Sequence, residues 1–357
     1  MRGGIFMKKN TMQSLADALG VSRITVWKAL NHKEGVSETL RQKIIEKAAE
    51  CGYRMPHTQP APPVSTPPVK VQRSVSVVVS RPESSTFWMQ IIHQIAKELS
   101  RLGINMMYTY LPSHWYEGFQ LPASLTDGGV SGMIVLNIYD PAMLRALAAL
   151  SLPKVFLDTV PLLGADQLNG DVVMLEGRCL VRQITNRLIE SGRTRLGFIG
   201  DVHYAQTNTD RYQGFLDALR EHNITLDETV CHTSPLPLHL HTEEIESFLR
   251  GLTYFPDAFV RASDFIASYV ASFFDQPAYA DQKRVVLTGF DNSSEYPSTA
   301  GKITSVDVQT STLGKRLAQK IAFRLRYPNA SFECSYITSK IIYRSPLTSP
   351  DEDNALL

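Results

Sequence analysis

The chain of 357 residues is poor in cysteine and has no long apolar run. Its four cysteines, Cys51, Cys179, Cys231 and Cys334, are widely separated and form no Cys-x-x-Cys pair. This usage indicates free thiols in a reducing cytoplasm and argues against a disulfide framework. The opening residues 1–10 lack the apolar core of a secretion signal, and no later segment approaches the roughly 20 apolar residues of a membrane span. We therefore expect a cytoplasmic protein with no membrane partner.

Sequence motifs that would indicate an enzyme are also missing. There is no GxxxxGKS or GxxxxGKT phosphate loop, no GxSxG nucleophile turn, no HExxH zinc motif and no GxGxxG after the first expected strand. The stretch TSTLGKRL at 310–317 has a lone Gly-Lys pair and is typical of a helix start. We expect no catalytic activity and no cofactor.

One stretch, CHTSPLPLHLH, collects residue types that bind metals. Its members are Cys231, His232, His239 and His241, and the last two share a face if the backbone is extended. The spacing matches no tetrahedral zinc pattern, and the prolines indicate a surface loop. We predict no metal site.

The most informative segment is TMQSLADALGVSRITVWKALN at residues 11–31, which predicts two short helices joined by a tight turn. Thr11 and Ser22 are good N-caps, because their hydroxyls accept from early backbone N–H groups of the helices that follow. Gly20 supplies the permissive backbone that ends the first helix. Apolar residues recur at helical spacing and predict the inward faces: Met12, Leu15, Ala16, Leu19, Val26 and Leu30.

A third helix is expected to follow Ser37 as its cap and to stop at Gly52. Leu40, Ile44 and Ala48 recur on one face of it, so the three helices close one small core. An ordinary helical bundle would share this pattern.

The distribution of charge favours a nucleic-acid reader over a plain bundle. Residues 7–57 hold nine Lys or Arg and five Asp or Glu, a net charge of +4, whereas the whole chain is at only +1. A basic head on a mildly acidic body suits phosphate binding combined with a separate function.

The segments LADALGVSRITVWKALN and GVSETLRQKIIEKAAECGYRMP resemble, in order and spacing, the DNA-binding head of the lactose-repressor (LacI/GalR) family. The resemblance implies that outward residues of the second helix meet base edges in the major groove of double-stranded DNA: Arg23, Ile24, Trp27 and Lys28. It also implies a set suited to phosphate contacts: Thr11, Ser22, Thr25, Asn31, Ser37 and Tyr53.

Two of these positions depart from the family. Trp27 stands where the family usually has a small residue, and its alternative role is to pack on the third helix. Lys28 stands where the family usually has Arg, and an ammonium lacks the bidentate fork of a guanidinium. The family's operator sequences therefore do not transfer to this chain.

The segment after the head is rich in proline and reads as an extended linker over residues 57–73. Prolines are spread through it: Pro60, Pro62, Pro63, Pro67 and Pro68. The family usually has a segment here that folds into a hinge helix on DNA, and the prolines predict that this helix is absent. Either the dimeric body only sets the spacing of two heads, or the protein binds DNA without ligand control.

Beyond the linker, strands and helices are expected to alternate, and the apolar runs read as buried parallel strands. A first series of expected elements comprises strands at 75–80, 104–111, 132–138 and 154–159 and a helix at 87–102. A second series is expected to begin with a strand at 171–175 and to continue with helices at 177–191 and 210–222 and strands at 195–201, 257–264 and 284–291. Ligands are expected at the carboxyl ends of such strands.

Landmarks of the family recur in this body: SGRTRLGFIGD, DRYQGFLDAL, RASD, VVLTGFD and ITSVDVQTSTLGKRLA. The resemblance implies a small all-α helix-turn-helix head joined to a two-lobed α/β, periplasmic-binding-protein-like domain with parallel sheets covered by helices. We predict a head at 7–56, the linker, an effector-binding and dimerisation domain at 74–346, and a C-terminal tail at 347–357.

The resemblance also implies an effector site formed by Phe87, Trp88, Asp158, Arg211, Asp264 and Asp291. Carboxylates, one guanidinium and aromatic faces suit a small polyhydroxylated molecule such as a sugar. Alternatively, Arg211 and one aspartate form a structural ion pair, or an aspartate caps a helix. Glu176 and Gly177 occupy the place where the family usually shows Asp-Asn.

We therefore predict a sequence-specific DNA-binding transcriptional regulator, a repressor that binds a near-palindromic operator as a homodimer under the control of a small-molecule effector. The alternative is a cytoplasmic small-molecule sensor or carrier whose head contacts protein or binds DNA only non-specifically.

Overall fold

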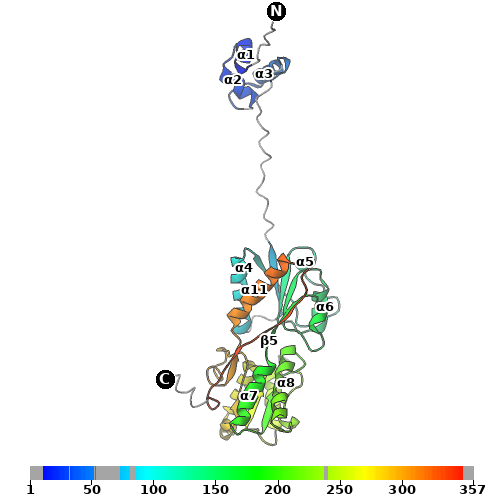
Figure 1. The fold of residues 1–357 in the computed structure, drawn as a ribbon, viewed down its shortest axis with the longest axis vertical. Coiled ribbons are helices and arrows are strands. Elements are labelled where there is room, and N and C mark those ends of the chain that lie inside the picture. Colours follow the sequence, from blue (N-terminus) through cyan, green and yellow to red (C-terminus); the bar gives the residue numbers. More distant parts are fainter. Residues whose placement is uncertain are drawn as a thin grey trace, which may run out of the picture. The chain divides into compact units, whose positions relative to one another are not determined.

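The computed structural model describes residues 11–31, 33–51, 53, 73–80, 85–236 and 240–348, and the chain divides into two units, Met1–Val71 and Gln72–Leu357 (Figure 1). Apart from Arg73, the proline-rich linker lies outside the described residues, as do Gly52 and His239.

The first unit is a three-helix head, as predicted. It contains α1 (Met12–Leu19), α2 (Arg23–Leu30) and α3 (Glu38–Glu50). Its buried core consists of Leu15, Ala16, Val26, Ala29, Ile44 and Ala48, of which all but Ala29 were predicted from helical spacing. The other predicted residues, Met12, Leu19, Leu30 and Leu40, are partly buried and pack against this core. Gly20 follows α1 with a φ of 68°, a left-handed conformation that favours glycine and turns the chain into α2.

The second unit has two lobes, and the first lobe is built on a six-stranded sheet in the order β10-β5-β4-β3-β1-β2. All of its strand pairs are parallel. The strands are β1 (Ser74–Val79), β2 (Asn105–Tyr110), β3 (Gly132–Leu136), β4 (Lys154–Leu157), β5 (Asp171–Leu175) and β10 (Cys334–Ile337). The helices of this lobe are α4 (Thr86–Arg101), α5 (Ala123–Thr126), α6 (Pro141–Ala149) and α11 (Thr310–Arg326), with a 3-10 turn η1 (Ala165–Gln167).

Helices cover both faces of this sheet (Figure 1). On one face, Val77 and Val79 pack in the same cluster as residues of α4 and α11. On the other face, Val78 packs with residues of α6. The continuous apolar run of β1 is therefore buried on both sides, as expected of a parallel strand between two layers of helices.

The second lobe has a smaller parallel sheet in the order β6-β7-β8 and an antiparallel pair, β9 with β11. These strands are β6 (Leu196–Ile199), β7 (Ala258–Arg261), β8 (Val286–Leu287), β9 (Ser305–Asp307) and β11 (Lys340–Ile342). The helices are α7 (Arg178–Glu190), α8 (Gln206–Glu221), α9 (His241–Gly251) and α10 (Asp264–Phe274), with the 3-10 turns η2 (Glu228–Val230) and η4 (Pro277–Arg284).

The strand at 171–175 does not begin the second series, contrary to the prediction. It is β5, which pairs with β4 and β10 in the sheet of the first lobe. The sequence of a buried apolar strand does not indicate which sheet the strand joins. The second lobe begins only with α7. The helix expected at 210–222 starts earlier, at Gln206. The prediction missed its first turn because that turn is polar and shows no apolar periodicity.

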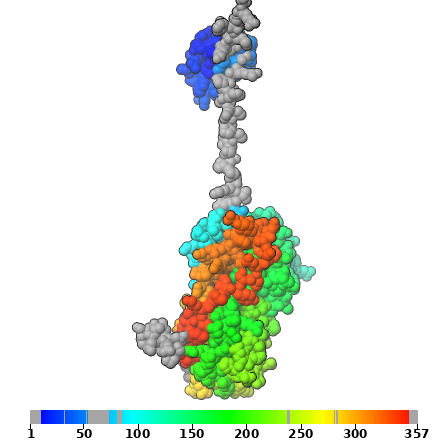
Figure 2. Space-filling view, viewed as in Figure 1, coloured from blue at the N-terminus to red at the C-terminus, as the bar shows by residue number. Residues whose placement is uncertain are grey.

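The chain passes between the lobes at three places. It leaves the first lobe after β5, returns after β9 to form α11, and leaves again between β10 and β11. Helix α11 packs along α4, where a Cβ on Gly314 would lie 2.6 Å from the carbonyl oxygen of Ile91. In Figure 2 the segment that follows α11, drawn in red, runs over the surface from one lobe onto the other.

Candidate functional site

The outer face of α2 carries three of the four residues predicted to read bases. Arg23 is exposed, and the side chains of Ile24 and Trp27 are 68% and 45% exposed. Trp27 therefore points outward and does not join the core with α3. Lys28 is partly buried, and a Cβ built on Gly35 would lie 3.4 Å from its amine, so its side chain folds back over the loop that follows α2.

The residues predicted to contact phosphate lie at or beside helix ends. The hydroxyls of Thr11, Ser22 and Ser37 accept hydrogen bonds from backbone N–H groups at the starts of α1, α2 and α3. The hydroxyls of Ser22 and Thr25 are 2.8 Å apart. A second group lies past the helix ends: the Asn31 amide donates to the carbonyl of Trp27, and Tyr53 packs against the core. Hydroxyls at exposed helix N-termini suit contact with anions.

Arg41, which sequence reasoning missed as a functional residue, holds the end of α2 in place. Its guanidinium donates to the carbonyl oxygens of Ala29 at 3.2 Å and Lys33 at 3.0 Å, with a longer contact of 3.4 Å to that of Lys28. The side chain is 11% exposed. A basic residue that satisfies the last carbonyls of a helix stabilises its end, so Arg41 positions α2 and its charge is already engaged.

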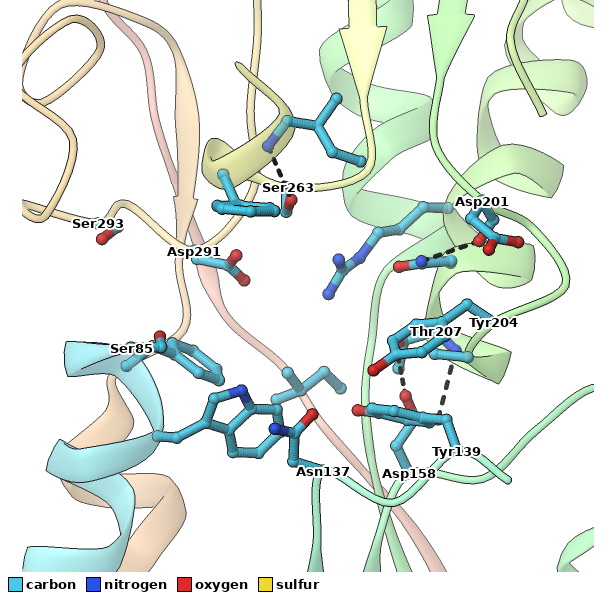
Figure 3. Close-up of a pocket in the computed structure, with 18 of the residues that line it drawn as sticks. Ser85, Asn137, Tyr139, Asp158, Asp201, Tyr204, Thr207, Ser263, Asp291 and Ser293 are labelled. Atoms are coloured by element: carbon cyan, nitrogen blue, oxygen red, sulfur yellow. Dashed lines mark hydrogen bonds between the residues drawn. The ribbon is translucent and has the colours of Figure 1, made fainter. Parts of the chain in front are cut away.

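A cavity of about 260 Å³ lies between the two lobes of the second unit (Figure 3). It is lined from the first lobe by Phe87, Trp88, Asn137, Tyr139 and Asp158, among others. From the second lobe its wall includes Asp201, Tyr204, Thr207, Arg211, Phe265, Asp291 and Tyr296. Five of the six residues predicted for the effector site therefore meet in one cavity at the carboxyl ends of strands.

Asp264 lies beside this cavity and is not part of its lining. Its carboxylate is buried and accepts hydrogen bonds from the backbone N–H of Ser293 at 2.7 Å and the hydroxyl of Ser305 at 2.8 Å. Burial raises the pKa of Asp264. Helix α10 begins at this residue after the N-cap Ser263, and the neighbours Ser263 and Phe265 line the cavity instead.

Asp158 joins the two lobes. It follows β4 with a φ of 70°, and its carboxylate accepts from the hydroxyl of Thr207 at 2.6 Å and from the backbone N–H groups of Thr159 and Thr207 at 2.7 and 3.3 Å. Figure 3 shows this contact at the edge of the cavity. Burial raises the pKa of Asp158 to about 6, although the hydrogen bonds and Arg211 oppose the rise. This aspartate therefore caps α8 across the interlobe boundary, which was the predicted alternative to ligand contact.

Arg211 and Asp291 both line the cavity, and the charge of each influences the pKa of the other. Burial lowers the pKa of Arg211, and the charges of Asp291 and Asp158 oppose this. Its guanidinium lies 3.7 Å from the ring centroid of Phe290 and donates to the carbonyl of Ala262, while its Nε has no partner among the described residues. Burial raises the pKa of Asp291 to about 8, opposed by Arg211. A buried donor without a partner and a carboxyl that titrates near neutrality suit recognition of a polar ligand.

Gly177 makes room for the buried arginine. A Cβ on this glycine would lie 2.8 Å from Cγ of Arg211, which is closer than real Cβ atoms approach. The preceding Glu176 accepts from the backbone N–H of Cys179 at 2.7 Å and so caps the first turn of α7. The replacement of the family's Asp-Asn pair by Glu-Gly thus combines a helix cap with space for Arg211.

Sequence reasoning missed much of the aromatic and amide lining. Tyr139 and Tyr204 come from different lobes, and their ring centroids are 4.4 Å apart. Asn137 follows β3 directly, and Tyr204 lies in the loop after β6. These residues could have been predicted from their position in the sequence, just beyond the carboxyl ends of expected parallel strands.

Two models of known protein families match parts of this chain. Residues 11–55 match the family model for bacterial regulatory proteins of the lacI family, and residues 185–345 match the model of a periplasmic binding protein-like domain. The chain therefore joins a DNA-binding domain of the lacI family to a periplasmic binding protein-like domain. These matches identify it as a DNA-binding transcriptional regulator, and its named relatives are regulators, not enzymes.

Among curated relatives, the HTH-type transcriptional repressor PurR of Mannheimia succiniciproducens is 23% identical over 344 residues, covering 94% of this chain and 97% of that protein. The regulator CelR of Thermobifida fusca is 23% identical over 325 residues, covering 89% and 92%. The structure of a CelR–cellobiose complex matches with a TM-score of 0.65 at 22% identity, covering 94% of this chain and 99% of that one. A lac repressor dimer bound to operator and an anti-inducer matches with a TM-score of 0.62 at 17% identity, covering 96% and 100%.

Among the described residues, no helix is both long and apolar enough to cross a bilayer. Nor do three His, Cys, Asp or Glu side chains gather in this part of the chain as a metal ion would require. Within CHTSPLPLHLH, His232 and His241 instead pack edge-on against Phe248 and Phe265.

Proposed function

We propose that this regulator is a cytoplasmic repressor that binds a near-palindromic operator as a homodimer and is controlled by a small polyhydroxylated molecule, such as a sugar. The observation that carries the proposal is the outward face of α2. The hydroxyl of its N-cap Ser22 is at the surface, Arg23 is exposed, and the core side of the helix is packed against α1 and α3. Such a helix presents side chains to a major groove while its neighbours hold it rigid.

The interlobe cavity supports the effector part of the proposal. It combines aromatic faces from both lobes with the carboxyl of Asp291, the guanidinium of Arg211 and the amide of Asn137. Hydroxyl groups pair well with such donors and acceptors, and aromatic rings pack against the CH faces of a sugar ring. The CelR structure that matches this chain is a complex with cellobiose, which agrees with a ligand of this class.

An exposed apolar edge supports the homodimer. Strand β2 is at the end of the six-stranded sheet, and the side chains of Met107, Tyr108 and Tyr110 on it are exposed. Exposed apolar strand edges are usually covered by a partner. A second copy is the partner that we propose, because two heads read a longer site than one and a two-fold pair reads a near-palindrome.

The proposal is tested by selecting bound duplexes from a randomised DNA pool with the purified full-length protein, at fixed moderate salt, with and without a mixture of mono- and disaccharides. We expect a near-palindromic site and a change in its affinity with at least one sugar fraction. The sugar that acts is then titrated against the tryptophan fluorescence of the protein, to which Trp88 in the cavity wall contributes.

Sedimentation supplies an independent readout of the dimer. We expect the wild-type protein to sediment as a dimer and Tyr110→Lys to dissociate, because a charge on the exposed edge opposes close pairing. Sequence-independent, salt-labile DNA binding by a monomer would contradict the proposal and favour a sensor whose head is a non-specific contact.

A further inference from the structure

Helix α2, the helix proposed to enter the major groove, presents apolar side chains where hydrogen-bonding groups would be expected. Ile24 and Trp27 are the two large apolar side chains that stand out as exposed among the described residues of the first unit. Both belong to α2, and they are three positions apart, so they lie next to each other on its surface. No described residue covers them.

Ile24 occupies the most outward position of the helix. Val26 and Ala29 are fully buried and define the inward side of α2. With 3.6 residues per turn, a residue two positions before Val26 and five before Ala29 points roughly away from both. Ile24 therefore projects farthest from the head, and Trp27 flanks it.

Apart from Arg23, the polar side chains around this pair are already engaged. The hydroxyl of Thr25 pairs with Ser22, and Arg41 donates to the carbonyls at the end of α2. Lys28 folds back toward the loop at Gly35. Arg23 is the basic residue of α2 that is exposed and makes no ion pair with a described residue.

We propose that Ile24 and Trp27 read the C5-methyl groups of thymine, so that each half-site carries T·A pairs where these two side chains enter the major groove. Thymine is the base whose major-groove edge carries an apolar group, and apolar side chains pack on that methyl. The basic balance of the head, with nine Lys or Arg against five acids over residues 7–57, matches the phosphates that flank such a contact. This inference rests on the proposed DNA-binding function and specifies its sequence preference.

The test replaces thymine by deoxyuridine, which pairs in the same way but lacks the methyl group. Starting from the best site recovered by selection, each thymine of a half-site is replaced in turn, and Kd is measured by fluorescence anisotropy at one salt concentration. We expect about a fourfold loss of wild-type affinity for each methyl that packs on Ile24 or Trp27, and no loss at other thymines.

Variants assign each methyl to its side chain. Ile24→Ala and Trp27→Ala are substitutions at exposed positions, and each should lose sensitivity to uridine at its own position while keeping it at the other. Lys43→Ala, at an exposed position of α3, is the matched control and should keep the full wild-type pattern of uridine sensitivity.

The outcomes separate this inference from the function on which it rests. If a preferred site is recovered but uridine leaves wild-type affinity unchanged at every position, the thymine inference is wrong and the repressor proposal stands. Equal uridine losses in Ile24→Ala, Trp27→Ala and wild type would also overturn it. If selection recovers no preferred sequence, both the inference and the proposed function are wrong, and the apolar pair is then a contact surface for protein.

Discussion

The carboxylate of Glu295 accepts hydrogen bonds from both the backbone N–H and the hydroxyl of Thr86, at 2.9 and 2.8 Å. Thr86 is the first residue of α4 in the first lobe, whereas Glu295 lies in a loop of the second. The N-cap position of α4 is Ser85, whose side chain makes no capping bond. The second lobe therefore supplies the cap that α4 lacks, so closure of the lobes and stability of this helix are coupled.

Removal of this carboxylate should destabilise the second unit. For Glu295→Ala we expect the free energy of unfolding to fall by about 1 kcal/mol, the usual cost of losing an N-cap. Urea unfolding followed by tryptophan fluorescence measures it. In a double-mutant cycle with Thr86→Val, which removes only the hydroxyl, the two losses should fall short of additivity by at least about 0.5 kcal/mol.

The control for this change is Glu117→Ala, which removes an exposed carboxylate of the first lobe. It should leave stability unchanged within the error of the measurement. Fully additive losses for Glu295→Ala and Thr86→Val would show that the contact is not formed in solution.

Gly177→Ala should displace Arg211, which lines the cavity. Gly177 has a φ of −116° and a ψ of −30°, which alanine adopts readily, so any effect comes from the clash of its Cβ with Cγ of Arg211. We expect a loss of about 1–3 kcal/mol in the free energy of unfolding, typical of overpacking a buried site. Gly251→Ala is the matched control, because its Cβ would meet nothing within 4 Å. If the Gly177→Ala protein is as stable as the control, the side chain of Arg211 shifts to make room at no measurable cost in free energy.

Periodicity and capping were enough to predict the head. Thr11, Ser22 and Ser37 are the caps, and Gly20 is the left-handed turn, because each of these features depends on residues only a few positions apart. Arg41 was missed for the opposite reason. Its partners are carbonyl oxygens of Ala29 and Lys33, and backbone acceptors leave no mark in a sequence.

The body was predicted less completely, since its organisation depends on contacts between distant segments. Strand β5 reads like any other buried strand, and its membership of the first sheet is fixed by pairing with β10, more than 150 residues later. Likewise, Asp158 and Asp264 were both plausible ligand contacts by sequence. Their actual hydrogen-bond partners, Thr207 and Ser305, come from other elements of the fold.

Arg41→Lys should destabilise helix α2 although it keeps the positive charge. A single ammonium cannot span the carbonyls of Ala29 and Lys33, and losing hydrogen bonds to a charged donor costs about 1.5–3 kcal/mol each. We expect backbone amides of α2 to exchange hydrogen at least about tenfold faster, as measured by mass spectrometry of peptides spanning Arg23–Leu30.

Lys43→Ala, at an exposed position of α3, is the control for this experiment and should leave that exchange unchanged. DNA binding gives a second discriminator. If Arg41 were a phosphate contact instead, Arg41→Ala would lower the slope of log affinity against log salt by about 1 and leave hydrogen exchange in α2 as in the wild type.

The partly buried carboxyl of Asp291 should make stability depend on pH. Because burial raises its pKa to about 8, the folded protein holds this proton between about pH 4 and 8, whereas the unfolded chain releases it. This group's contribution to stability is therefore greatest below about pH 4 and is lost as the pH rises toward 8. Asp291→Asn lacks this proton, so the wild type should lose up to about 1.4 kcal/mol more per pH unit than the variant between pH 5.5 and 7.5. Urea unfolding at three pH values within that range gives both slopes.

Asp166→Asn, which changes an exposed carboxyl, is the control and should keep the wild-type slope. Parallel slopes for wild type and Asp291→Asn would mean that Asp291 is already ionised in the folded protein, held by the charge of Arg211.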